Sequence, residues 1–212
     1  MYESLAAFRA DALVCGAAHY PDASLEPPMI EAAYRIYRGV AGGTKLANLA
    51  GDAVDFGVTI VGRLALRAED GKWVPADESF PAIDEIMREN LGVTGEGGGG
   101  GAILDAARWS LLANDAWLLG GIHAQTEFHF ASPLRWENIW NEARGRMTVT
   151  AREVIGIVSF GYRIRRTVLE PVGVCADAAK ARTASLPAYQ AAVRANGTAE
   201  RLRSLLAGHK LA

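Results

Sequence analysis

The chain has 212 residues, of which 50% are hydrophobic and 22% are charged, a balance that is typical of globular proteins and excludes global disorder. Its length fits one domain around one hydrophobic core. A formal net charge of −2 argues against electrostatic capture of nucleic acid, which normally needs a basic surface. We therefore expect a single globular domain over residues 1–212 whose partner is a protein or a small-molecule ligand.

The cysteine content and the apolar patterning bear on the cellular location. Cys15 and Cys175 are the only cysteines, too few for a disulfide framework, which favours a reducing cytoplasm. The start of the chain lacks the basic stretch and uninterrupted apolar run of a signal peptide. No apolar run approaches the roughly 18 residues of a membrane span. These patterns predict a cytoplasmic protein without a membrane span, and a protein secreted without a leader would share them.

The first part of the chain carries helix signals and one hairpin signal. Ser4 caps the first expected helix, and Pro27-Pro28 open the second. Asp70-Gly71 lies between two strand-like runs and matches the two-residue turn of a β-hairpin. The elements expected here are helices over residues 4–19, from 27, over 44–56 and over 81–89, and strands within 58–75.

A glycine-rich run occupies the middle of the chain. Seven of the ten residues in GVTGEGGGGG are glycine, and such a run has high backbone entropy and seldom builds regular structure. We expect a flexible loop near residues 95–101. The alternative is a cradle of backbone amides that binds an anion at the start of a helix over residues 102–113.

The segment IHAQTEFHF, residues 122–130, has the strongest alternation in the sequence. In a strand, successive side chains point to opposite faces, so His123, Gln125, Glu127 and His129 would share one face. The apolar residues between them would point toward the core. This polar face has two interpretations. It is either the ordinary solvent-exposed face of an antiparallel strand or a functional site with titratable side chains.

Glu127 and His129 are the best candidates for chemistry in this segment. A carboxylate beside an imidazole raises the imidazole pKa and orients its proton, which suits a general acid/base pair. The same two side chains could reach one metal ion. His123 would lie about 20 Å from His129 on an extended strand, too far to share that ion without a bend. The metal and the cofactor stay unspecified.

A helix is expected over residues 132–144. Trp136 and Trp140 are one turn apart on its apolar side, a spacing that is typical of a core-facing helix and also suits a ligand platform. Arg135 lies on its polar side. Further on, Thr150 and Glu153 have the spacing of a capping box, which predicts a helix start at Thr150.

The end of the chain is expected to hold a strand and two helices. Pro171 would interrupt a strand over residues 162–174 or confine it to a sheet edge. Asn196-Gly197 separate closing helices over residues 176–194 and 198–208, and Pro187 divides the first of them.

These elements predict an α+β fold that is predominantly helical, with a small, mainly antiparallel sheet from residues 58–75, 116–131 and 162–174. The favoured function is a binding or interaction module of the accessory, adaptor or immunity type. Its ligand would be contacted by Gln125, Arg135, Trp136 and Trp140. The alternative is a small hydrolase or transferase, metal-assisted or not, with Glu127, His129 and His123 as catalytic residues. The sequence leaves open whether the protein is an enzyme, and its oligomeric state.

Overall fold

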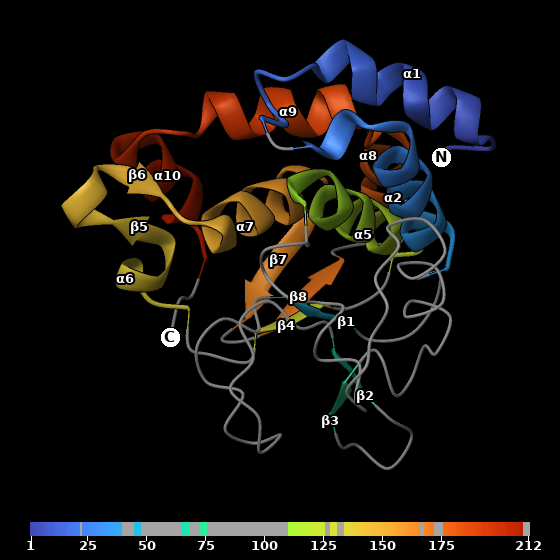
Figure 1. Ribbon diagram of the computed structural model, residues 1–212. Coiled ribbons are helices and arrows are strands. Elements are labelled where there is room, and N and C mark those ends of the chain that lie inside the picture. Colours follow the sequence, from blue (N-terminus) through green and yellow to red (C-terminus); the bar gives the residue numbers. More distant parts are fainter. Residues whose placement is uncertain are drawn as a thin grey trace.

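The computed structural model describes most of the two ends of the chain and short pieces of its middle. The described residues are 1–21, 23–39, 45–47, 65–67, 73–75, 110–125, 128–130, 134–165, 168–171 and 176–209. Among them, helices predominate and cover one face of a small sheet (Figure 1), which confirms the α+β class. None of the described helices has the length and apolar character that a membrane crossing requires.

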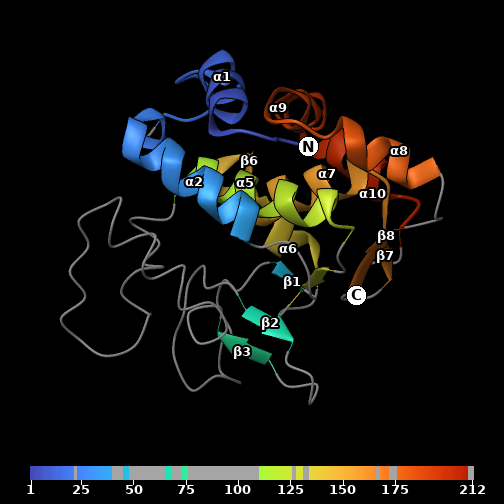
Figure 2. The ribbon, with the colours of Figure 1, turned by 90° about the vertical axis from the view of Figure 1, so that its right-hand side faces the viewer.

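The helices form two layers above the sheet. Figure 2 shows α1 and α9 side by side at the top, with α5 and α7 beneath them and the strands below. The longer helices are α1 (Leu5–Cys15), α2 (Pro27–Gly39), α5 (Leu111–His123), α7 (Val149–Ser159), α8 (Ala176–Thr183), α9 (Leu186–Ala195) and α10 (Ala199–Leu206). The shorter ones are η1 (Ala23–Leu25), α6 (Trp136–Ile139) and η4 (Glu142–Arg144).

Side-chain caps explain where several of these helices begin. Six of the described residues use a side-chain oxygen to accept a hydrogen bond from the backbone N–H three residues later: Ser4, Ser110, Asn141, Thr148, Ser185 and Thr198. The predicted cap at Ser4 is thus confirmed. The predicted helix start at Thr150 is wrong, because Thr148 is the cap of α7 and Thr150 lies inside the helix.

The main sheet is mixed, with one parallel pairing. Its strand order is β3-β2-β1-β4-β8-β7. The strands are β1 (Lys45–Ala47), β2 (Ala65–Arg67), β3 (Trp73–Pro75), β4 (Phe128–Phe130), β7 (Tyr162–Arg165) and β8 (Val168–Pro171). Only β1 and β4 run parallel, so the sheet is mainly antiparallel, as predicted. A separate hairpin pairs β5 (Trp140–Asn141) with β6 (Arg146–Met147).

Several predicted elements differ from the structure. The predicted antiparallel pairing on either side of Asp70-Gly71 is confirmed, with Arg67 opposite Trp73, whereas a two-residue turn at Asp70-Gly71 would place Arg67 opposite Val74; the turn itself lies outside the described residues. The predicted helix over residues 44–56 is wrong at Lys45–Ala47, which form strand β1. The single strand predicted over residues 162–174 is instead a hairpin of β7 and β8. The helix over 132–144 is wrong beyond the single turn of α6, because the chain turns into β5 at Trp140.

Other predictions lie beyond the described residues. The glycine-rich run near 95–101 and the helix over 81–89 belong to this group, and both stay predictions. The closing helices are confirmed as α8, α9 and α10, with Ser185 capping α9 and Pro187 in its first turn. Proline fits there because its missing N–H would have no partner inside the helix.

Close contacts hold the helical layers together and join them to the sheet. The rings of Trp117 in α5 and Phe128 in β4 meet edge to face, with their centroids 5.8 Å apart. The Phe128 ring also meets that of Tyr162 in β7, with a centroid distance of 5.4 Å. Between α5 and α2 the backbones approach closely, because a Cβ on Gly120 would lie 2.7 Å from the carbonyl oxygen of Tyr37. Here glycine is needed for space.

Gly156 makes a similar close approach between α7 and α9. A Cβ at this position would lie 2.1 Å from Cε2 of Tyr189. The Tyr189 ring is fully buried, and its hydroxyl donates a 2.9 Å hydrogen bond to the backbone oxygen of Arg152. The ring therefore has little freedom to move away from an added methyl group.

Gly156→Ala is expected to lower the free energy of unfolding by about 1–3 kcal/mol, the usual effect of overpacking a core. This loss should appear even though alanine is the better helix former by about 1 kcal/mol. Urea unfolding followed by circular dichroism measures it. Gly208→Ala is the matched control, because a Cβ there meets no atom within 4 Å. Equal stabilities of the two variants would contradict the close packing of α7 on α9.

Candidate functional site

His123 does not lie on a strand. It is the last residue of α5, and the alternation predicted for residues 122–130 is wrong before β4. Its Nε2 lies 2.8 Å from the carbonyl oxygen of Ala184 and therefore donates to it, which leaves Nδ1 to accept from the Tyr37 hydroxyl at 2.9 Å. Burial lowers the pKa of His123, and the bond to Ala184 opposes this. The neutral ring thus ties α5 to α2 and to the chain before α9.

Of the other candidate residues in that segment, the structure describes Gln125 and the backbone of His129. Gln125 is exposed in the turn after α5, with a φ of 53°, so it is not in a strand. His129 belongs to β4, where its backbone pairs with Leu46 and Val168. Glu127 lies outside the described residues. An acid/base pair of Glu127 and His129 stays a prediction.

Trp136 and Trp140 do come together, although α6 is a single turn. Their rings stack with centroids 6.1 Å apart. Arg203 of α10 lies over the Trp136 ring at 4.2 Å, and the Trp136 indole donates to Glu142 at 2.9 Å. Arg135 is exposed, 3.9 Å from a Glu137 oxygen. The stack links α6 and β5 to α10, and a ligand-binding role for Arg135, Trp136 and Trp140 stays a prediction.

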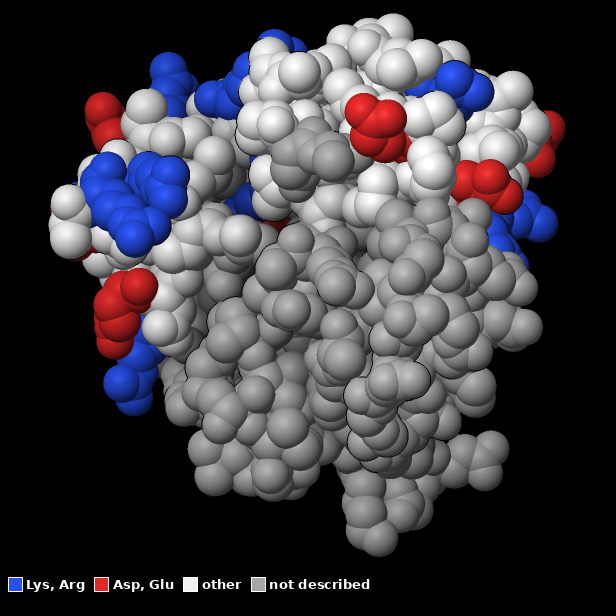
Figure 3. Space-filling view, in the orientation of Figure 1, with Lys and Arg blue, Asp and Glu red and all other residues white. Residues whose placement is uncertain are grey.

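A pocket of about 460 Å³ lies between the β5–β6 hairpin and the N-terminus of α7. We call it the arginine pocket, because Arg144, Arg146 and Arg152 line it and none of its described lining residues is acidic. Its other lining residues are Asn141 and Thr148, which are polar, and Leu111, Met147 and Val149, which are apolar. Arg144 and Arg146 are exposed, and basic side chains gather over the hairpin at the left of Figure 3.

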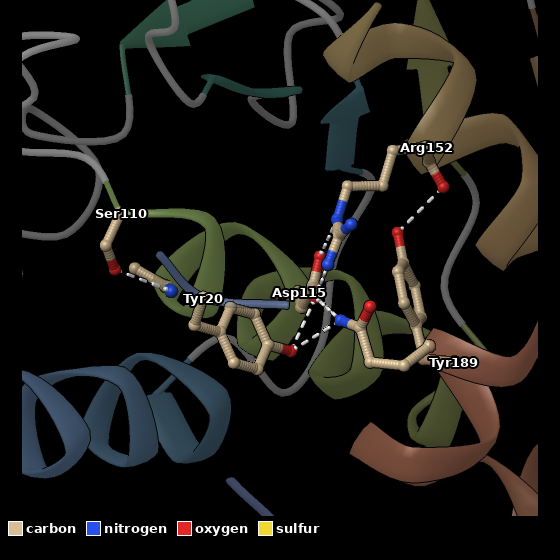
Figure 4. Close-up of polar contacts among 7 residues, drawn as sticks. Tyr20, Ser110, Asp115, Arg152 and Tyr189 are labelled. Carbon is tan, nitrogen blue, oxygen red and sulfur yellow. Dashed lines mark hydrogen bonds and ion pairs between the residues drawn. The ribbon is translucent and has the colours of Figure 1, made fainter. Parts of the chain in front are cut away.

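Arg152 is the buried member of the three arginines, and Asp115 of α5 fixes its orientation. Arg152 donates from Nε to Oδ1 of Asp115 at 2.9 Å and from Nη2 to Oδ2 at 2.6 Å (Figure 4). Such a bidentate pair holds the guanidinium plane in one direction. No hydrogen bond among the described residues uses Nη1. Arg152 is also one of the residues that line the pocket.

Two further side chains hold Asp115 in place. The Tyr20 hydroxyl donates to Oδ2 at 2.6 Å, and the Gln190 amide donates to the same oxygen at 2.7 Å. The carboxylate of Asp115 thus accepts four hydrogen bonds from α7, α9 and the segment after α1. Its own side chain has no exposed surface. The network fixes the position of Arg152 through contacts that a ligand in the pocket need not disturb.

The surroundings keep Arg152 charged. Burial alone would lower the pKa of Arg152, but the adjacent Asp115 carboxylate more than offsets this and raises it. The rings of Tyr20 and Tyr189 lie 5.9 and 5.7 Å from the guanidinium carbon, where cation–π attraction adds to the charge stabilisation. Because Asp115 cancels the charge of Arg152, the net positive charge of the pocket comes from Arg144 and Arg146.

The start of α7 adds to this positive character. Val149 and Thr150 are in its first turn, where backbone N–H groups have no carbonyl partner inside the helix. The Thr148 hydroxyl accepts from Ala151 N–H only. Helix N-termini attract negative charge. Together with three guanidinium groups, the arrangement can bind an anion and donate several charge-assisted hydrogen bonds to it.

Glu153 follows Arg152 but lies apart from the pocket. Burial raises its pKa to about 8, and a hydrogen bond with the Asn114 side chain partly opposes the shift. Its Oε2 atom has no hydrogen-bond partner among the described residues. A carboxyl group in this position is protonated at neutral pH, because an unpaired buried charge is strongly disfavoured.

Sequence reasoning missed the buried network and the pocket. Asn114 and Asp115 interrupt the apolar run LLANDAWLLGGI, and a buried carboxylate needs a partner, so this interruption was an available signal. The partner, Arg152, is 37 residues away, and no local spacing marks it. Within the described residues, no group of three His, Cys, Asp or Glu side chains could hold a metal ion.

Comparison with protein-family models, with curated proteins and with solved structures found no match for this chain.

Proposed function

We propose that this protein is a binding module that takes an anionic ligand, with a carboxylate or phosphate group, in the arginine pocket. The observation that carries the proposal is the geometry of Arg152. A buried carboxylate fixes two of its nitrogens, and Arg152 lines a pocket that Arg144 and Arg146 also line. A guanidinium that is already ordered loses little further entropy when it binds an anion.

The types of residue in the pocket support binding rather than catalysis. A general base must accept a proton from the substrate near neutral pH. Arginine stays protonated, and the amide, hydroxyl and apolar side chains of the other lining residues are not bases. The described lining therefore supplies donors and shape but no proton acceptor of the usual kind. This matches the module favoured by the sequence, at a different surface.

The double variant Arg144→Gln/Arg146→Gln tests the proposal without touching the buried network. Because both side chains are exposed, the fold should be unaffected. Loss of two charge-assisted contacts is expected to weaken binding of acetate and of inorganic phosphate about tenfold or more, equivalent to about 1.4 kcal/mol. Isothermal titration calorimetry at low salt measures the affinity.

Arg182→Gln is the matched control, since Arg182 is an exposed residue of α8 that does not line the pocket. Its affinity for both anions should equal that of the wild type. Saturable binding that the double variant loses and the control keeps supports the proposal. The absence of saturable binding of either anion to the wild type, or equal affinities for all three proteins, contradicts it.

A further inference from the structure

The arginine pocket is lined by apolar side chains as well as by guanidinium groups. Leu111, Met147 and Val149 line it alongside the three arginines. Val149, the first residue of α7, is 51% exposed. Among the described residues, the other large hydrophobic side chains with such exposure are Met1, Leu13 and Val14 of the N-terminal segment. Val149 is thus an apolar contact surface inside a charged pocket.

The volume of the pocket also exceeds what an inorganic anion requires. At about 460 Å³, it falls within the range of roughly 300–1,000 Å³ that is typical of sites for organic ligands. A simple anion on the arginines would leave Val149 and Met147 in contact with water. An apolar group attached to the anion would cover them and gain the free energy of removing apolar surface from water.

Met147 suits this role because its side chain can adapt to the ligand. It is partly buried and packs against the core, and its unbranched thioether adopts several shapes at little cost. The Met147 methyl group also lies near Gly197, in the connection between α9 and α10.

We propose that the natural ligand is a small amphiphilic acid, with its anionic group on Arg144, Arg146 and Arg152 and a short apolar chain or ring on Val149 and Met147. This inference rests on the proposed function and adds the chemical class of the ligand. The anionic group is a carboxylate or a phosphate ester, since the guanidinium fork matches both. Affinity should therefore rise with apolar length at constant charge.

Calorimetry with matched pairs of anions tests the inference: acetate against hexanoate, and inorganic phosphate against phenyl phosphate. Each fully buried methylene group strengthens binding by about fourfold. Because the pocket is open, we expect hexanoate to bind about tenfold or more tightly than acetate. The same direction is expected for phenyl phosphate over phosphate. The comparison of acetate with inorganic phosphate identifies the preferred anionic group.

Val149→Ser localises the effect. It should reduce the preference for hexanoate over acetate about threefold or more, and leave the affinity for acetate unchanged. Leu13→Ser is the matched control, because Leu13 is 52% exposed on α1 and does not line the pocket. Both variants alter exposed side chains, so both should fold.

The outcomes separate this inference from the proposed function. If acetate and phosphate bind in an arginine-dependent way but the longer anions bind no more tightly, the amphiphilic ligand is excluded and the anion site stands. The inference is also overturned if the Val149→Ser variant prefers hexanoate over acetate as strongly as the wild type does. If no anion binds, the proposed function fails and the inference fails with it. A preference lost in Val149→Ser and kept in Leu13→Ser supports both.

Discussion

Asp115→Asn is expected to lower the free energy of unfolding by about 3–5 kcal/mol, the usual effect of removing one partner from a buried ion pair. Asp115 accepts hydrogen bonds from Arg152, Tyr20 and Gln190 and donates none. An asparagine would turn two amide hydrogens toward these donors. It would also leave the Arg152 charge without a counterion in a buried position.

Chemical denaturation of the wild type and of Asp115→Asn measures this loss. The control is the double variant Asp115→Leu/Arg152→Met, which removes both charges together. Because no buried charge is left unpaired, this variant should recover much of the lost stability. It should also lose the affinity for anions, since Arg152 is absent. A loss below about 1 kcal/mol in Asp115→Asn would show that the network is not buried as described.

Glu153→Gln is expected to stabilise the protein at alkaline pH. Burial raises the pKa of Glu153 to about 8, compared with 4.5 for an ordinary glutamate. The unfolded chain therefore loses this proton at lower pH than the folded protein does. The contribution of Glu153 to stability is complete below pH 4.5 and is lost as the pH rises toward 8, by about 1.4 kcal/mol per pH unit.

Glutamine cannot ionise, so the variant lacks this loss. The free energies of unfolding of the two proteins should be similar at pH 4.5 and differ on the order of 4 kcal/mol at pH 8, with the variant more stable. Urea unfolding across this pH range measures the difference. Glu31→Gln, on the exposed surface of α2, is the control and should follow the wild type. A pH-independent difference for Glu153→Gln would disprove the raised pKa.

Local signals in the sequence predicted a large part of the helical framework. Ser4, Pro27 and Pro187 mark helix starts through the hydrogen bonds and fixed φ angles of the first turn, and these operate within a few residues. The antiparallel pairing of β2 with β3 was also predicted locally, from the turn residues between two strand-like runs, although its register was not. Such signals do not depend on the rest of the fold.

The assignment of α5 failed because its surroundings, rather than its local pattern, decide its structure. Every residue from Leu112 to Ile122 is buried, so the helix faces the protein interior on all sides and its apolar residues show no 3.6-residue period. Polar and apolar residues alternate from the end of α5 into β4, so the sequence pattern of a strand begins before the strand itself does. Polar residues that would normally mark a solvent face, Asn114 and Asp115, here point into the protein.

The candidate site was out of reach of the sequence for a related reason. Arg144 is the last residue of the predicted helix over 132–144, Arg146 lies just beyond it, and Arg152 lies one turn into α7. Only the folding of the hairpin onto the helix start brings the three guanidinium groups to one pocket. The histidines and tryptophans attracted attention by residue type, whereas the pocket depends on two exposed arginines and one buried arginine in a particular arrangement.

The packing of α1 on α9 has a consequence for synthesis of the chain. Phe8, Ala12 and Cys15 form the buried side of α1, and the Leu186 N–H donates to the Tyr2 hydroxyl at 2.7 Å. A ribosome that adds about 5–20 residues per second needs roughly 10–35 seconds to travel from α1 to α9. Phe8 can meet Tyr34 and Tyr37 of α2 soon after synthesis, but the part of α1 that packs on α9 has no final partner throughout this interval. That part of the helix stays open to chaperones until α9 is made.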